Sequence, residues 1–309
     1  MAKSLFRPGA LALISGSASG VGYAFAAHCR RQGMNLALLD INKDTLTQAK
    51  STLESISSAE NTKVQTYALD VSDHNAWLAV RDSLTETFPS NEGTIDVLLL
   101  NAGTSVKSTT AQPWEDINYF TKTLNTNLFG VINGLSTLLP LVQKSRGPSA
   151  IILTGSKQGI TNPPGNPAYN ASKSAVKTLA EQLAYSLRTS GNASFAPHVS
   201  VHLLVPGWTF TGLSGNAGPV SDDVAREKKP KGAWLASQVV EFGVQKIEEG
   251  KFYVLVPDED VDEQLDQARV TWAAGDVSEG RAALSRWEDG WKDRAAEWIG
   301  GEAERRRKL

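Results

Sequence analysis

The chain has 309 residues, and its 31 Lys and Arg nearly balance its 33 Asp and Glu. Hydrophobic residues make up 41% of the sequence and charged residues 21%, which excludes a disordered chain, a collagen and a dedicated binder of polyanions. We therefore expect a globular protein with one sizeable core and no nucleic-acid partner.

Few residues of the sequence could bind a metal or form a disulfide. Cys29 is the single cysteine, and the four histidines are scattered without the spacing of metal ligands. We expect a reducing compartment, no intramolecular disulfide and no metal site.

Neither end of the sequence has the pattern of a targeting signal. Nine residues precede the first apolar run, too few for a secretion signal, and no stretch approaches about 18 consecutive apolar residues. The last residues, Arg307, Lys308 and Leu309, resemble the peroxisomal Ser-Lys-Leu signal, but an Arg stands where that signal needs a small residue. We predict a soluble, cytoplasmic protein with no membrane partner, whose basic end is the solvated end of a helix.

Short apolar runs rich in Val, Ile and Leu recur along the first 257 residues. The seven runs are 10–15, 35–40, 63–69, 95–100, 149–154, 199–205 and 251–256. They lack strict polar alternation, as strands buried on both faces do, and the segments of about 20 or more residues between them suit crossover helices. The pattern predicts an α/β fold with a doubly wound parallel sheet. Because no linker divides the runs, we expect one main domain over residues 1–257.

The first run leads directly into a glycine-rich turn and a helical pattern. Gly16, Gly20 and Gly22 would let the backbone approach a pyrophosphate, which the amino end of the following helix would bind. The second run ends at Asp40, 18 residues after Gly22, where a carboxylate can accept hydrogen bonds from the ribose of adenosine. Together they predict a dinucleotide site. The alternatives are ordinary turn glycines, and Asp40 as the N-cap of a helix that starts near Lys43.

A third group of residues predicts a proton-transfer site. Tyr169 and Lys173 are four residues apart, so they share a helix face, and Ser156 lies 13 residues before Tyr169 at the end of the fifth run. An ammonium group one turn away, aided by the positive charge of an oxidised nicotinamide, would lower the pKa of the phenol towards neutrality. The Ser156 hydroxyl could then hold a substrate oxygen beside Tyr169. The alternative is a buried Tyr against which the aliphatic part of a Lys packs.

Two segments fall outside this alternation of strands and helices. Residues 209–231 are rich in Gly, Asp and Lys, and we expect them to form a long loop that acts as a lid.

Residues 258–309 form a C-terminal extension with two apolar stripes at helical spacing and a break at Gly275 and Asp276. The stripes are Val261, Leu265, Ala268 and Trp272, then Leu284, Trp287, Trp291, Ala295 and Trp298. We expect two amphipathic helices that dock on the last-strand side of the sheet or on a partner subunit. The alternative is an appendage for an unrelated partner.

In these motifs the sequence resembles the short-chain dehydrogenase/reductase family, in its compact single-domain branch. The motifs occur in the family's order and spacing over about residues 8–257. The matching residues are Ser15, Gly16, Gly20, Gly22, Asp70, Val71, Asn101, Ala102, Gly103, Asn127, Ser156, Tyr169, Lys173, Pro206, Gly207, Trp208, Thr209, Phe210 and Thr211. The resemblance implies a Rossmann fold with a seven-stranded parallel sheet and an NAD(P)-dependent oxidoreductase.

The resemblance also implies a role for each residue. Asn127 would anchor a water that links Lys173 to solvent, and Ser156 would orient a carbonyl. Tyr169 would exchange the proton, while Lys173 would bind the nicotinamide ribose and lower the pKa of Tyr169. The expected cofactor-binding residues are Gly16, Ser19, Gly20, Val21, Gly22, Asp40, Asp70, Val71, Asn101, Ala102, Gly103, Tyr169, Lys173, Pro206, Gly207, Thr209 and Thr211.

The sequence departs from the family pattern at three places. Ser15 replaces the usual Thr before the first glycine, and Leu100 stands where an Asn is frequent. These two changes keep the local chemistry. Lys157 and Gln158 follow Ser156 where small residues are usual, which places a long polar pair beside the substrate.

We predict an NAD(H)-dependent alcohol dehydrogenase or carbonyl reductase that acts on a secondary alcohol or ketone. It should prefer NADH to NADPH, because Asp40 would repel a 2′-phosphate. The expected substrate-binding residues are Ser156, Gln158, Pro163, Trp208 and Phe210, with packing of the lid on the sheet as the alternative for the two aromatic residues. The resemblance also implies a homodimer or homotetramer built on the helix around 118–142 and the helix of Tyr169. The rival hypothesis is a non-catalytic dinucleotide-binding sensor or scaffold.

Overall fold

The computed structural model describes residues 4–56, 62–214 and 218–309. Seven parallel strands form one sheet in the order β3-β2-β1-β4-β5-β6-β9. The strands are β1 (Leu11–Ser15), β2 (Asn35–Asp40), β3 (Val64–Ala68), β4 (Val97–Leu100), β5 (Ser149–Thr154), β6 (Val199–Val205) and β9 (Tyr253–Leu255). Each lies within one of the seven apolar runs, so the predicted Rossmann fold is confirmed.

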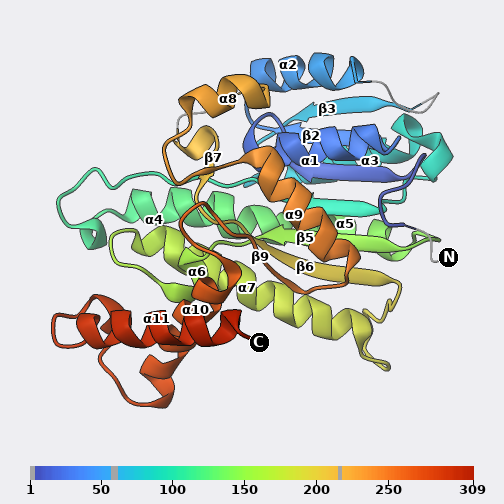
Figure 1. Cartoon of the computed structure of the whole chain (residues 1–309). Coiled ribbons are helices and arrows are strands. Elements are labelled where there is room, and N and C mark those ends of the chain that lie inside the picture. The colour runs from blue at the N-terminus through green and yellow to red at the C-terminus, as the bar shows by residue number, and fades with distance from the viewer. Residues whose placement is uncertain (1–3, 57–61, 215–217) are drawn as a thin grey trace.

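Helices cover both faces of the sheet (Figure 1). One face carries α1 (Gly20–Arg31), α2 (Lys43–Glu54) and α9 (Ala236–Glu248), and the other carries α3 (His74–Thr87), α5 (Gly130–Gln143) and α7 (Pro167–Arg188). Successive residues of β1 alternate between two buried clusters: Leu13 packs in the cluster of Trp77, whereas Ile14 packs in that of Phe25. Because both faces are covered, every residue of β1 is buried, which explains the absence of polar alternation.

Short polar side chains fix where several helices begin. The Asn42 side chain accepts a hydrogen bond from the backbone N–H of Thr45 at the start of α2, and Asp73 does the same for Asn75 at the start of α3. Between β4 and β5 the chain forms α4 (Ile117–Leu124), a π-helical turn η3 (Asn125–Phe129) and then α5. The remaining short elements are η1 (Pro89–Asn91), η2 (Pro113–Glu115) and α6 (Gln158–Thr161).

The predicted lid, residues 209–231, is partly regular structure. It begins with β7 (Thr209–Phe210), which pairs in parallel with β8 (Trp234–Leu235), and it contains η4 (Gly212–Ser214) and α8 (Asp222–Lys228). Residues 215–217 of the predicted loop lie outside the described residues. Strands β7 and β8 were not predicted, because two-residue strands are too short to show a period of two.

The C-terminal extension has a small apolar core of its own. It consists of α10 (Glu263–Ser278), η5 (Ser285–Trp287) and α11 (Lys292–Arg307). The buried residues of this core are Ala268, Trp272, Ala295, Ile299 and Ala303, and Leu265 and Trp291 pack against them. The extension therefore consists of packed helices, as the apolar stripes predicted.

Two details of the predicted extension are wrong. Helix α10 continues through Gly275 and Asp276, where a break was expected, because the Asp276 carboxylate accepts hydrogen bonds from Ser285 and pairs with Arg281. The second stripe does not lie on one helix, since Leu284 has a left-handed backbone (φ 57°) and α11 begins only at Lys292. Trp298 remains 41% exposed at the edge of the small core.

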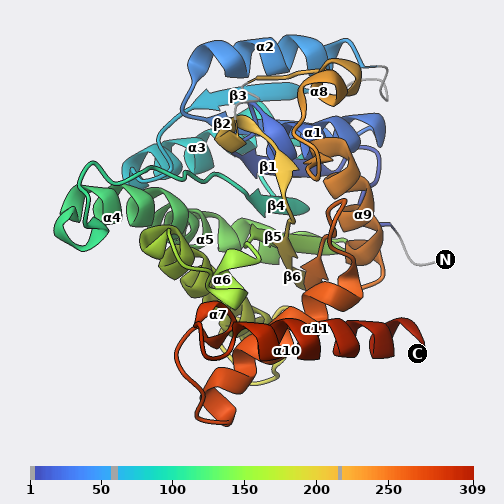
Figure 2. The same cartoon turned by 60° about the vertical axis from the view of Figure 1, so that its left-hand side comes forward.

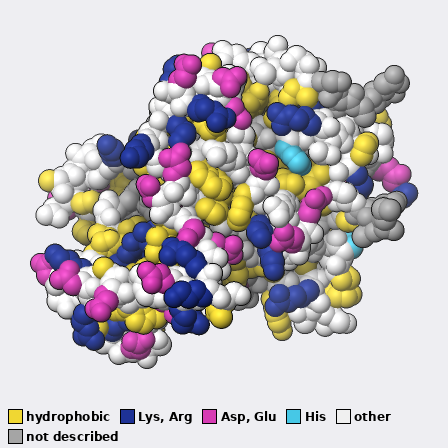
Figure 3. All heavy atoms as spheres, in the orientation of Figure 1, with side chains coloured by type: hydrophobic (Ala, Val, Ile, Leu, Met, Phe, Trp, Pro, Cys, Tyr) yellow, Lys and Arg dark blue, Asp and Glu magenta, His cyan; other side chains and the backbone are white. Residues whose placement is uncertain are grey.

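The extension lies at the end of the molecule opposite α2 and β3, beside α6 and α7 (Figures 1 and 2). Helix α10 packs on α6 of the same chain. Lys, Arg, Asp and Glu side chains are interspersed over the visible surface of α10 and α11, with no large area of one charge (Figure 3). Within the described residues, no helix is both long and apolar enough to cross a membrane.

Candidate functional site

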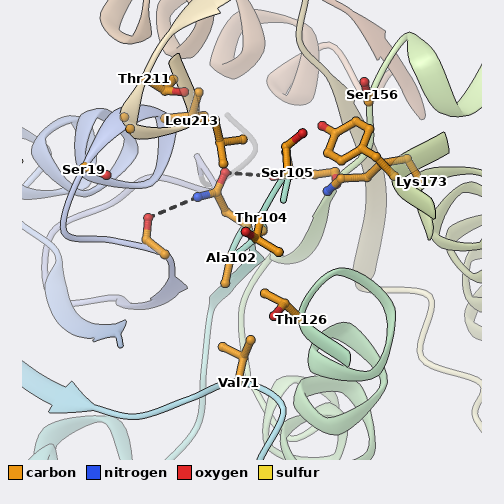
Figure 4. Close-up of a pocket in the computed structure, with 18 of the residues that line it drawn as sticks. Ser19, Val71, Ala102, Thr104, Ser105, Thr126, Ser156, Lys173, Thr211 and Leu213 are labelled. Carbon is orange, nitrogen blue, oxygen red and sulfur yellow. Dashed lines mark hydrogen bonds between the residues drawn. The ribbon is translucent and has the colours of Figure 1, made fainter. Parts of the chain in front are cut away.

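A cavity of about 730 Å³ opens at the carboxyl ends of the parallel strands. Its lining residues follow β1, β2, β3, β4, β5 and β6, so the cavity extends across the point between β1 and β4 where the strand order reverses. Ligands of open α/β sheets bind at this position. Ser19 and Thr211 lie on one side of the cavity and Ser156 and Lys173 on the other, with Val71 and Thr126 below them (Figure 4).

The glycine-rich turn forms one end of the cavity. Gly16 and Gly20 have positive φ angles of 64° and 55°, a conformation that favours glycine. A Cβ on Gly16 would lie 2.8 Å from the Cα of Ala102, and one on Gly22 would lie 2.1 Å from the carbonyl oxygen of Gly16. Side chains are therefore excluded here, and the first backbone N–H groups of α1 lie at the cavity wall.

Asp40 lies at the end of β2, beside this turn. One carboxylate oxygen accepts a hydrogen bond from the backbone N–H of Ala18 at 3.0 Å, and the other accepts from that of Asn42 at 3.1 Å. Asn42, rather than Asp40, caps α2 through Thr45. The alternative role of Asp40 as the N-cap is therefore wrong, and its carboxylate is fixed in the cavity wall.

The segment after β4 is tied to both neighbouring strands. The Asn101 side chain donates to the carbonyl oxygen of Gly16 at 3.2 Å and accepts from the Thr154 hydroxyl at 3.1 Å. The Ser15 hydroxyl oxygen accepts from the backbone N–H groups of Asn101 (3.0 Å) and Ala102 (3.1 Å). Ser15 can therefore make these contacts in place of a Thr, as we expected for this departure.

Tyr169, Lys173 and Ser156 meet on the opposite wall. Tyr169 and Lys173 lie one turn apart on α7, and the Ser156 hydroxyl lies close enough to the Tyr169 hydroxyl to lower the pKa of Tyr169. The Lys173 ammonium donates to the carbonyl oxygen of Thr154 at 2.8 Å and lies 5.9 Å from the centroid of the Tyr169 ring. Lys173 is 4% exposed.

Burial shifts the pKa values of both Tyr169 and Lys173. It raises the pKa of Tyr169 above its usual value, and the neighbouring Ser156 hydroxyl acts in the opposite direction. Burial lowers the pKa of Lys173 to about 8. The expected lowering of the Tyr169 pKa, which also needs the positive charge of an oxidised nicotinamide, stays a prediction.

Asn127 lies in the π-helical turn η3 and is fully buried. Its side-chain oxygen accepts from the Thr104 N–H at 2.7 Å, and its side-chain nitrogen donates to the Thr104 carbonyl at 2.9 Å and to the Ser172 hydroxyl at 3.1 Å. Asn127 therefore joins the loop after β4 to the helix of Tyr169 without lining the cavity. π-Helical turns are frequently found at functional sites.

The expected site residues divide into those that line the cavity and those that support it. The lining residues are Gly16, Ser19, Gly20, Val21, Asp40, Asp70, Val71, Asn101, Ala102, Gly103, Ser156, Gln158, Tyr169, Lys173, Pro206, Trp208, Thr209 and Thr211. Gly22, Asn127 and Gly207 lie behind the wall. Pro163 and Phe210 were expected to bind substrate but do not line the cavity. The Pro163 carbonyl accepts from Asn170, and Phe210 is buried in the lid.

The sequence analysis missed other residues of the lining. They are Ile41, Leu69, Thr104, Ser105, Val106, Lys122, Thr126, Thr154, Gly155, Gly212 and Leu213. Most adjoin an expected residue in sequence and could have been found from that adjacency. Thr126 directly precedes Asn127, but Lys122 adjoins no expected residue, and only the packing of α4 brings it to the cavity. Lys157 points away from the lining and forms ion pairs with Asp258 and Asp266.

Metal binding finds no support in the part of the chain that the structure describes. No group of three or more His, Cys, Asp and Glu side chains is arranged there to hold an ion. The polar groups of the cavity wall are amides, hydroxyls, a phenol, ammonium groups and the carboxylates of Asp40 and Asp70.

Comparison with known proteins gives a consistent result. The family model described as short chain dehydrogenase matches residues 10–220. The chain is 30% identical over 210 residues to the oxidoreductase SadH of Mycobacterium tuberculosis, covering 68% of this chain and 70% of that protein. It is 29% identical over 245 residues to the 3-dehydrosphinganine reductase TSC10B of Arabidopsis thaliana, covering 78% of this chain and 68% of that protein.

A solved structure supports the same assignment over more of the chain. A short chain dehydrogenase/reductase from Burkholderia phymatum, solved in complex with NAD, matches with a TM-score of 0.73 and 27% identity. The match covers 91% of this chain and 98% of that one. The order of the strands, the glycine turn and the Ser, Tyr and Lys of the cavity are thus accounted for together: the chain belongs to the short chain dehydrogenase family.

Proposed function

We propose that the protein is an NAD(H)-dependent oxidoreductase that transfers a hydride between the nicotinamide and a secondary alcohol or ketone. The observation that carries this proposal is that the hydroxyls of Tyr169 and Ser156 lie together in a cavity that the buried Lys173 also lines. It places a proton donor beside a second hydroxyl that can hold a carbonyl oxygen. Membership of the short chain dehydrogenase family supports it.

The cavity fits a nicotinamide dinucleotide. The turn at Gly16 and Gly20 leaves backbone N–H groups and no side chain at the wall, which suits a pyrophosphate. The Asp40 carboxylate would accept hydrogen bonds from the hydroxyls of the adenosine ribose. Asp70 and Val71 would border the adenine. Thr209 and Thr211, which line the cavity after β6, would hold the carboxamide. When bound, the reduced cofactor supplies the hydride.

The side chains of this chain would handle the proton. Ser156 would orient the carbonyl oxygen towards Tyr169, and the Tyr169 hydroxyl would donate its proton in reduction and recover one in oxidation. Because burial raises the pKa of Tyr169, the hydroxyl is protonated at neutral pH and ready to act as the acid. The nearby ammonium of Lys173 would favour the phenolate that is left.

The lining beyond Ser156 suggests an uncharged substrate of some size. Trp208, Leu213, Val106 and Gln158 contribute apolar or neutral polar groups to this part of the cavity. Trp208 is 50% exposed, so its ring is available to a ligand. An aromatic and aliphatic wall favours a ketone larger than a two- or three-carbon compound.

The decisive experiment measures NADH binding and NADH oxidation against a panel of ketones that increase in apolar size. We expect turnover that improves with the size of the ketone. Tight NADH binding without turnover of any ketone would instead favour the rival hypothesis of a cofactor-binding sensor.

We also propose a homodimer or homotetramer that uses the surface of α4, α5 and α7. Ile117 on α4, Phe129 at the end of η3 directly before α5, and Tyr185 on α7 are 73%, 49% and 52% exposed, so a partner subunit could cover these large apolar side chains. Sedimentation velocity at micromolar concentration tests this proposal, and a monomer would contradict it.

A further inference from the structure

The side chain of Lys157, directly after Ser156, connects this part of the cavity to the C-terminal extension. Its ammonium nitrogen lies 2.5 Å from a carboxylate oxygen of Asp266 and 3.3 Å from one of Asp258. The side chains are 18%, 6% and 11% exposed for Lys157, Asp266 and Asp258, respectively. The ion pairs are therefore largely shielded from water, unlike the exposed pairs elsewhere on the extension.

The carboxylate of Asp258 also binds the segment after β6, which carries Trp208. The oxygen that faces Lys157 accepts a hydrogen bond from the backbone N–H of Trp208 at 3.1 Å. A Cβ on Gly207 would lie 2.6 Å from that oxygen and 2.9 Å from the Lys157 ammonium. The junction is thus closely packed, and it joins the segment after β5, the segment after β6 and the extension.

Hydrogen bonds to the backbone of Lys157 connect this residue to α6. Its carbonyl oxygen accepts from the backbone N–H of Thr161 at 2.9 Å and from the Thr161 hydroxyl at 3.0 Å. On the other side, a Cβ on Gly159 would lie 2.6 Å from the backbone of Lys173. The turn that carries Ser156 and Gln158 is therefore enclosed between α7 and the extension, with little room to move.

We infer that Lys157, Asp258 and Asp266 are positioning residues through which the C-terminal extension sets the places of Ser156 and Trp208, and so the binding of the ketone. This inference rests on the proposed function. The physical reason is that a buried charge needs its partner: removing the ammonium leaves two shielded carboxylates facing each other, and the segments must separate or admit water. Arg269 also lies close enough to act on the charge of Asp266, but it belongs to α10 and does not connect α10 to Ser156.

The experiment compares Lys157→Gln, Asp266→Asn and the double variant with wild type. We expect each single variant to raise the KM for the ketone at least tenfold, with a smaller change in kcat. The dissociation constant of NADH should stay within twofold, because the glycine turn and Asp40 are not touched. The double variant should lose less than the product of the single effects, because it removes the repulsion between Asp258 and Asp266 that Lys157→Gln alone leaves.

A matched control comes from the same extension. Lys292 pairs with Asp289 at 2.9 Å, but these side chains are 53% and 94% exposed, so Lys292→Gln should leave KM unchanged. Hydrogen–deuterium exchange provides a readout that needs no turnover. Lys157→Gln should speed exchange in peptides that cover 156–161 and 207–210, whereas Lys292→Gln should not.

The outcomes separate the inference from its alternatives. A lower melting temperature with unchanged KM and unchanged exchange in both segments would overturn it, since Lys157 would then only stabilise the fold. Equal losses of NADH and ketone binding would overturn it as well. If wild type reduces no ketone, the proposed function fails, and faster exchange in Lys157→Gln still supports the positioning role, while unchanged exchange rejects it.

Discussion

At the end of the cavity near Asp40, the wall consists of a tight glycine turn, backbone N–H groups and carboxylates that follow strands of the sheet. At the end near Trp208, the wall consists of side chains from the segment after β6, the lid and the turn before α6. The first end rests directly on the seven-stranded sheet. The second is held by Asp258 and by contacts with the C-terminal extension.

The two ends of the cavity therefore bind their ligands with different groups: one with backbone, the other with side chains. A pyrophosphate is bound by backbone groups, and backbone groups are placed by the sheet itself. A ketone is selected by side chains, and those side chains come from segments that pack on the outside of the sheet. Changes at the Asp40 end should therefore alter cofactor choice alone, and changes at the Trp208 end should alter substrate binding alone.

The largest effect is expected where the two ends meet. Tyr169→Phe keeps the ring but removes the proton donor, so turnover should fall by about 10² to 10⁴ while the dissociation constant of NADH stays within twofold. Tyr185→Phe, farther along α7 and 52% exposed, is the matched control. Steady-state kinetics with NADH and one ketone check the expectation, and near-normal turnover of Tyr169→Phe would reject the mechanism.

The Asp40 end should discriminate between the two cofactors. Repulsion between the Asp40 carboxylate and a 2′-phosphate, with the loss of a ribose hydrogen bond, is expected to contribute about 2 to 3 kcal/mol. The kcat/KM for NADH should then exceed that for NADPH by about 30- to 150-fold. Asp40→Ala should lower the ratio of kcat/KM for NADH to kcat/KM for NADPH. Asp44→Asn, on the exposed face of α2, should leave this ratio unchanged. Equal use of both cofactors by wild type would show that Asp40 has another role.

The Trp208 end should respond to the size of its aromatic wall. Trp208→Ala removes a half-exposed ring, and we expect the KM for an apolar ketone to rise about tenfold, equivalent to about 1.4 kcal/mol. NADH binding should not change. Trp114→Ala, which removes a ring that is 75% exposed and does not line the cavity, serves as the control. A parallel loss of NADH affinity would contradict the independence of the two ends.

The smallest effect is expected when the pH is changed: kcat/KM should change less than tenfold per pH unit. Reduction needs the protonated Tyr169 and the charged Lys173, whereas oxidation needs the phenolate. Since burial lowers the pKa of Lys173 to about 8 and raises that of Tyr169, kcat/KM for reduction should be steady below about pH 8 and fall above it. The kcat/KM for oxidation of the alcohol should rise above about pH 8. Profiles measured in both directions check the signs, and a reduction rate that rises above pH 8 would contradict them.

The elements built on local pattern were predicted well from the sequence. The seven strands lie within the predicted runs, and Asp40, Ser156, Tyr169 and Lys173 all line one cavity. The failures involve contacts between distant segments. Phe210 turns into the lid because Ala225, Ala233 and Leu235 cover it, and the expected break at Gly275 is absent because Asp276 is held by Ser285.

The sequence by itself determined the sheet and the glycine turn, because hydrophobic period and backbone freedom act over a few neighbouring residues. It also placed Tyr169 and Lys173 on one face, because four residues make about one helical turn. Only the tertiary structure decided that Lys157 leaves the cavity for Asp258 and Asp266, and that burial raises the pKa of Tyr169. Ion pairing and desolvation depend on which distant segments exclude water from a side chain, and no local pattern records that.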